Sequence, residues 1–95
     1  MNGVPDNQTR ALLEVVYRVS IHVRALSSEM TSQEIHWLMD AIHNIPHYLQ
    51  SGDPDFWHAI AWSFRSYDER FSKQSGLRLV EIFQEAGGEF PADID

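Results

Sequence analysis

Apolar residues recur every three to four positions along most of the chain, the spacing of helices that bury one face. This pattern predicts four helices, over about residues 7–27, 32–44, 54–71 and 77–86. No segment shows the strict alternation of apolar and polar residues that is typical of a strand. Four amphipathic helices with short connections predict an all-α fold, a small bundle of about four helices.

The 95 residues are expected to form a single helical domain, because a chain of this length buries enough surface for one core and not for two. Segments 1–6 and 88–95 are expected to be loose termini, although Phe90 is apolar enough to dock on the core. The first residues lack the basic and apolar regions of a signal peptide, and no apolar run is as long as a membrane span. A soluble, cytoplasmic protein is therefore expected.

Residues at the expected helix ends match known capping patterns. Thr31 followed three positions later by Glu34 predicts a capping box, in which each residue satisfies a backbone N–H of the first turn. Pro46 is expected to end or kink the second helix, because its ring crowds the preceding turn. Asp53 before Pro54 predicts an N-cap followed by proline at the first helical position.

The first helix carries two apolar strips. The predicted core strip consists of Leu12, Val16, Val19, Val23 and Leu26, and the second, on nearly the opposite side, consists of Leu13, Tyr17 and Ile21. A helix that is apolar on two sides is either central in the fold or covered by a second subunit. The second strip is therefore a candidate homodimer interface, and self-assembly is one alternative interpretation of the protein.

The chain is acidic, with 14 acidic and 7 basic residues and a net charge of −7. Residues 25–64 contain neither lysine nor arginine. This balance disfavours direct binding to nucleic acid or to an anionic membrane, which depends on basic residues. A basic protein partner is expected instead, although negative charge also simply keeps a small protein soluble.

Aromatic residues within and beside this base-free segment predict a surface that binds another protein. Trp62 faces the polar side of its helix, where an indole is typical of an interface unless it packs on the second strip of the first helix. The expected contact residues are Trp62, Trp37, Tyr48 and Arg65, with Asp40, Asp53 and Asp55 as charges that steer the approach.

The second helix also carries a row of potential metal ligands or acid–base groups. His36, Asp40, His43 and His47 project along one narrow strip if the helix continues past Pro46. These four span about 16 Å, so at most three can bind one ion: either His36, Asp40 and His43, or Asp40, His43 and His47. A further ligand from another helix, such as His22 or His58, would complete the site. Zinc or another divalent metal is expected only on this alternative interpretation. On the structural interpretation, Asp40 fixes His36 or His43 by a hydrogen bond.

Other catalytic signatures are missing from the sequence. It has no cysteine, no G-x-S-x-G motif and no glycine-rich phosphate loop. The segment "MDAIHNIP", followed by a tryptophan-bearing helix and "SYDERF", resembles small uncharacterised bacterial proteins that carry a D-A-x-H-N-x-P segment. The resemblance covers about half of the chain and implies no activity.

The leading interpretation is a non-enzymatic, acidic interaction protein without a cofactor. By analogy of size and charge it would be an inhibitor, such as an immunity protein, an antitoxin or an anti-defence protein. It would act by covering a basic or nucleic-acid-binding protein. The metal or acid–base site and the self-assembling structural protein are the two alternatives.

Overall fold

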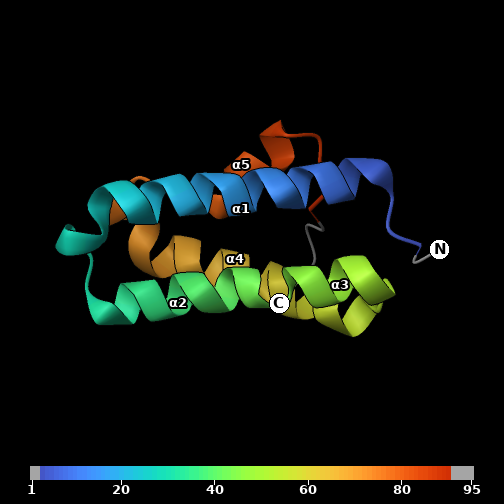
Figure 1. Cartoon of the computed structure of the whole chain (residues 1–95), viewed down its shortest axis with the longest axis horizontal. Coiled ribbons are helices and arrows are strands. Elements are labelled where there is room, and N and C mark those ends of the chain that lie inside the picture. The colour runs from blue at the N-terminus through green and yellow to red at the C-terminus, as the bar shows by residue number, and fades with distance from the viewer. Residues whose placement is uncertain (1–2, 91–95) are drawn as a thin grey trace.

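The fold is all-α, as predicted (Figure 1). A computed structural model describes residues 3–90, and no strand occurs among them. The helices are α1 (Asp6–Leu26), the 3₁₀ turn η1 (Ser27–Glu29), α2 (Ser32–His43), α3 (Ile45–Ser51), α4 (Pro54–Ser75) and α5 (Leu79–Glu85). No helix within 3–90 is long and apolar enough to cross a membrane.

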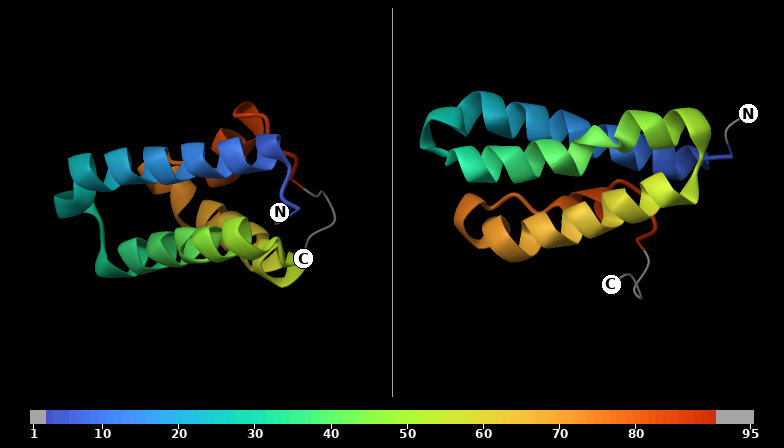
Figure 2. Two further views of the ribbon diagram at one scale, coloured as in Figure 1. Left: turned by 45° about the vertical axis from the view of Figure 1, so that its right-hand side comes forward. Right: turned by 90° about the horizontal axis from the view of Figure 1, so that it is seen from below.

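The helices form a bundle in which α4 lies at the centre of the contacts. α2 and α3 pack along α4, α5 packs on both α4 and α1, and α1 runs antiparallel to α2 (Figures 1 and 2). Short connections between consecutive helices favour this antiparallel order. The arrangement leaves α1 covered mainly by α5, and it places the side chains of α2 directly against those of α4.

The second predicted helix corresponds to α2, and a further helix, α3, begins directly after Asn44. Pro46 occupies the first turn of α3, where its missing N–H costs no hydrogen bond, and the N–H of Tyr48 donates to the carbonyl of Asn44 at 3.0 Å. The predicted break at Pro46 is therefore confirmed, and the break is followed by a seven-residue helix that was not predicted. Gly52, with φ of 71°, ends α3 in the left-handed conformation.

The N-caps predicted at α2 and α4 are found, but the return half of the capping box is not, because the Glu34 carboxylate accepts the hydroxyl of Tyr67 instead of the N–H of Thr31. The Thr31 hydroxyl accepts the N–H of Glu34 at 3.0 Å, and the Asp53 carboxylate accepts the N–H of Asp55 at 2.9 Å. α5 is capped from a distance: the two carboxylate oxygens of Asp68, in α4, accept the N–H groups of Leu79 and Val80 at 2.8 and 3.0 Å. Burial raises the pKa of Asp68, and these two donors oppose the rise.

The core is apolar and rich in aromatic side chains. Phe83 of α5 is fully buried, and its ring packs against Trp57, Phe64 and Phe90 with centroids 5.6, 6.2 and 6.3 Å away. The other large, fully buried side chains are Tyr67, Leu12, Leu38, Ile45, Ile60, Leu79, Val15 and Val19. The aromatic contacts of Phe83 join α4, α5 and the segment after α5.

Residues 88–90 are attached to the fold, although they were expected to be loose. The N–H of Glu89 donates to the side chain of Gln8 at 2.8 Å, and Phe90 packs edge-on against Trp57. At the other terminus, Asp6 already belongs to α1. Residues 1–2 and 91–95 of the predicted termini lie outside the described residues.

One of the two apolar strips of α1 is buried and the other is exposed. Ala11, Leu12, Val15 and Val19 face the core, close to the predicted strip, while Val16 and Val23 are half-buried. The side chains of the second strip are 52% (Leu13), 61% (Tyr17) and 43% (Ile21) exposed. The alternative in which α1 is central and covered on both sides within one chain is therefore wrong.

Candidate functional site

Two tryptophans meet where α2 packs along α4. The rings of Trp37 and Trp62 are tilted by 31° with centroids 6.1 Å apart, and Trp62 is 49% exposed. The guanidinium carbon of Arg70 lies 4.5 Å from the centroid of the Trp37 ring, within the range of a cation–π interaction. We call these three residues the tryptophan surface. Trp37 is half-buried beneath Trp62, and Trp62 is the more exposed of the two rings.

Charged residues of both signs flank the tryptophan surface. Asp55 and Glu69 lie seven residues before and after Trp62, hence on the same side of α4, and both are exposed. Asp40 is exposed on α2, and Arg65 is half-buried one turn after Trp62. The segment 25–64 has no base of its own, but α4 brings Arg65 and Arg70 to it.

Tyr48 does not belong to the tryptophan surface. Its side chain is 8% exposed, and its ring packs against Trp57 with centroids 5.7 Å apart. Burial accordingly raises the pKa of Tyr48. Tyr48, which was expected to be a contact residue, is therefore part of the core. Asp53, another expected contact residue, is exposed at the start of α4, where its carboxylate caps the helix.

The predicted row of histidines is present on α2 and α3 but does not converge on one point. His36 Nε2 lies 3.5 Å from Asp40 Oδ2, and both side chains are mostly exposed. His43 instead meets His47 edge-on at 5.5 Å, and His47 stacks on Phe56 at 5.4 Å. Among residues 3–90, no three side chains of the ligand types are close enough together to hold a metal ion. His36, Asp40 and His43 therefore do not form a three-ligand site.

A buried polar cluster, not predicted from the sequence, joins α2 to the end of α4. The Tyr67 hydroxyl donates to Glu34 Oε2 at 3.0 Å and lies 3.1 Å from Ser75 Oγ, which in turn accepts the N–H of Leu77. Glu34 is 7% exposed, so its carboxylate accepts the hydrogen bond of Tyr67 inside the bundle. A cavity of about 190 Å³ adjoins the cluster, and His22, whose Nε2 has no hydrogen-bond partner, also lines it.

The cluster predicts a distinctive alkaline response of the fold. Burial raises the pKa of Tyr67 to about 12 from its ordinary value of 10.0. Between these two values the native state keeps a proton that the unfolded chain has lost, so stability falls as the pH rises through this window.

A Tyr67→Phe variant should show a smaller loss of stability than the wild type between about pH 10 and 12. Urea unfolding of both proteins at several pH values in this window measures the difference. A second series near pH 8 serves as the control. At this pH Tyr67 is protonated in both the folded and the unfolded wild type, so the variant differs only by the lost hydrogen bonds of the hydroxyl. Parallel stability curves from pH 10 to 12 would contradict the assignment.

The tryptophan surface is thus the most exposed aromatic feature on α2 and α4, while the polar cluster is enclosed and connects structural elements. Comparison of the chain with models of protein families, with curated proteins and with solved structures gave no match.

Proposed function

We propose that this chain is a non-enzymatic binding protein that docks on another protein through the tryptophan surface. The half-exposed ring of Trp62 is the observation that carries the proposal. Exposing half of an indole on a folded monomer forfeits apolar burial, and tryptophan is among the residues that dominate binding energy at interfaces. Neither the exposure of Trp62 nor the role of tryptophan at interfaces requires a chemical reaction at the surface.

The contacts that hold Trp62 in place also favour binding. Trp37 packs against it from α2, and Arg70 stacks on Trp37. A side chain that is already held in place loses less conformational freedom when a partner covers it, so more of the contact energy remains as affinity. The tryptophan surface is therefore preorganised for binding.

Charge favours a basic partner. The chain carries a net charge of −7, and Asp40, Asp55 and Glu69 are exposed around the tryptophan surface. Of the two arginines of α4 near this surface, Arg70 is engaged with Trp37 and Arg65 is half-buried. Exposed carboxylates accelerate the approach of a positively charged protein and disfavour acidic competitors. The proposed action is inhibition by occlusion: the chain covers the basic or nucleic-acid-binding face of its partner, in the manner of an immunity protein, an antitoxin or an anti-defence protein.

The test begins with capture of binding proteins from the source cells, using the wild type and the Trp62→Asp variant side by side. A protein retained by the wild type and lost with Trp62→Asp is the expected partner. Its association rate should then fall about tenfold or more between about 50 mM and 500 mM salt, because salt screens long-range attraction. A rate that does not depend on salt would contradict the basic partner while leaving the role of Trp62 standing.

A further inference from the structure

The cavity beside the buried polar cluster is a candidate binding site of its own. It lies where the ends of α1 and α4 meet the start of α2, at one end of the bundle (Figure 1). Its volume is about 190 Å³, and none of the residues of the tryptophan surface lines it. We propose that this cavity binds a small organic cation, a primary ammonium group on a short alkyl chain.

Glu34 supplies a buried negative charge to the cavity. Its side chain is 7% exposed, and among residues 3–90 no lysine, arginine or histidine nitrogen lies within 4.0 Å of its carboxylate. The hydroxyl of Tyr67 is the one described group that donates to this carboxylate, at 3.0 Å to Oε2. A buried charge is costly unless it is both paired and hydrogen-bonded, so Glu34 favours a cation in the cavity.

His22 adds a hydrogen-bonding atom that the fold does not use. Its Nε2 atom is buried, and among the described residues it has no hydrogen-bond partner, although its side chain lines the same cavity. Most buried polar atoms in proteins are hydrogen-bonded, so an unpartnered one requires an explanation. When the ring proton is on Nδ1, the neutral imidazole offers Nε2 as an acceptor, and an ammonium group can donate to it.

The hydrogen bonds of the polar cluster leave acceptors without donors. The single proton of the Tyr67 hydroxyl goes to Glu34, so the hydroxyl of Ser75 must donate in the 3.1 Å contact between the two hydroxyls. Ser75 Oγ also accepts the N–H of Leu77 and has no proton left to give. The acceptors that remain belong to Glu34, Ser75 and His22. An ammonium group donates up to three hydrogen bonds and accepts none.

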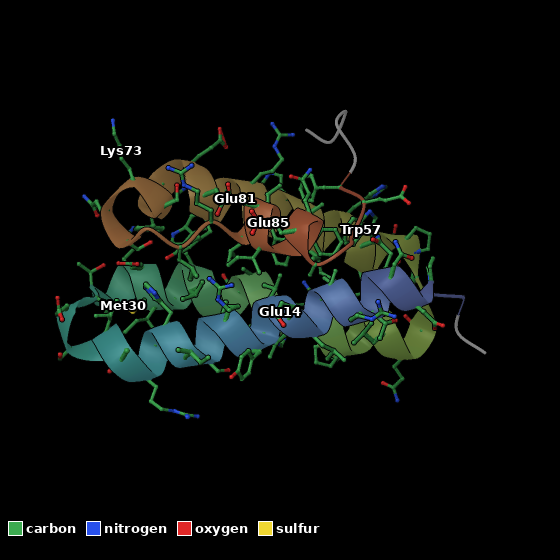
Figure 3. All side chains as sticks on the ribbon, turned by 90° about the horizontal axis from the view of Figure 1, so that it is seen from above. Glu14, Met30, Trp57, Lys73, Glu81 and Glu85 are labelled. Atoms are coloured by element: carbon green, nitrogen blue, oxygen red, sulfur yellow. The ribbon has the colours of Figure 1, made fainter. Side chains whose placement is uncertain are left out.

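The other charges around the cavity also favour a cation. Glu29 lines it, whereas no lysine or arginine does. Lys73 belongs to the last turns of α4 but projects away from the bundle (Figure 3). α1 and α4, the two longest helices, both end beside the cavity, and the C-terminal end of a helix carries partial negative charge. The N-terminal end of α2 opposes them alone.

The size and the walls of the cavity indicate a short alkyl chain. Leu26 and Met30 give it an apolar side. Its volume is below the roughly 300 Å³ of the smallest drug-sized sites, so a ligand of only a few carbon atoms fits. A metal ion suits it less well, because within residues 3–90 no three histidine, aspartate or glutamate side chains are close enough together to hold one.

Titration with n-butylammonium, followed by the amide chemical shifts in nuclear magnetic resonance spectra, tests the proposal. Saturable shifts are expected at Thr31, Glu34 and Ser75, with a Kd of about 1 mM or tighter, while the indole N–H of Trp62 should not shift. n-Butanol has the same alkyl chain without the charge. It should bind at least about tenfold more weakly, because hydrogen bonds to a charged donor are the stronger ones.

Two variants test the assigned residues. Glu34→Gln keeps an acceptor for Tyr67 but removes the charge, so it should weaken binding of n-butylammonium at least about tenfold. His22→Phe removes Nε2 and leaves the polar cluster intact, so it remains informative if Glu34→Gln does not fold. It should weaken binding about threefold or more. Glu81→Gln, the same change at an exposed position of α5, is the matched control and should leave the Kd unaltered.

The absence of saturable shifts up to about 20 mM n-butylammonium would overturn the proposal. Equal affinity for n-butanol would also overturn it, because the cavity would then not recognise the charge. Unchanged binding by either variant, or shifts centred on Trp62, would contradict the site itself. None of these outcomes bears on docking through the tryptophan surface, which the Trp62→Asp variant tests separately.

Discussion

The Trp62→Asp variant is expected to bind the partner at least about 100-fold more weakly than the wild type. The substitution removes the largest exposed apolar side chain of the tryptophan surface and places a carboxylate where the partner excludes water. Trp62 is half exposed and the buried cluster does not include it, so the fold should persist. The affinities are measured by titration calorimetry, and circular dichroism checks the helix content.

Met39→Asp is the matched control for this variant. Met39 is 40% exposed, similar to Trp62, and it lies on α2 away from the side that packs on α4. The same aspartate at position 39 should change the affinity only severalfold. Equal losses for Met39→Asp and Trp62→Asp would show that added charge, and not the loss of the indole, weakens binding.

The Phe83→Ala variant is expected to lose about 3–5 kcal/mol of unfolding free energy. Phe83 is fully buried and contacts the rings of Trp57, Phe64 and Phe90, so its removal leaves a cavity and ends three aromatic contacts. Domains of this size have about 5–15 kcal/mol in total, so the variant should be close to unfolding. Urea unfolding near neutral pH measures the loss.

Phe90→Ala is the comparison for this second variant. Phe90 contacts the rings of Trp57 and Phe83 from the segment after α5, but it is only partly buried, so less apolar area is lost. Its expected cost is about 1–2 kcal/mol. If Phe83→Ala cost no more than Phe90→Ala, the packing of α5 on α4 through Phe83 would be contradicted.

The features predicted correctly from the sequence depend on neighbouring residues. The Thr31 cap, the Asp53 cap and the break at Pro46 each involve residues within three or four positions, and local chemistry determines them. The all-α class follows in the same way, because the spacing of apolar residues reports on each helix separately.

The features that the sequence did not predict involve residues far apart in the chain. Tyr67 bonds to Glu34 from 33 positions away, and Arg70 reaches Trp37 across the same pair of helices. Helical spacing places a side chain on a face but does not say which helix covers that face. For that reason Tyr48, aromatic and next to a polar row, was expected at the surface and is instead buried against Trp57.

The histidine row shows the same limitation. The expected alignment of His36 with Asp40 is present, at 3.5 Å, because four residues make about one helical turn. A metal site needs a further ligand from another helix, and only the packing of helices decides whether one is near. In the described part of the chain none is close enough.

Hydrogen exchange of the complex with the captured partner tests the central claim most directly. Slower exchange is predicted in α2 and α4 around Trp37 and Trp62, with little change in α1 and α5. Protection confined to α1 and α5, with α2 and α4 exchanging as in the free protein, would contradict the assignment of the tryptophan surface as the binding site.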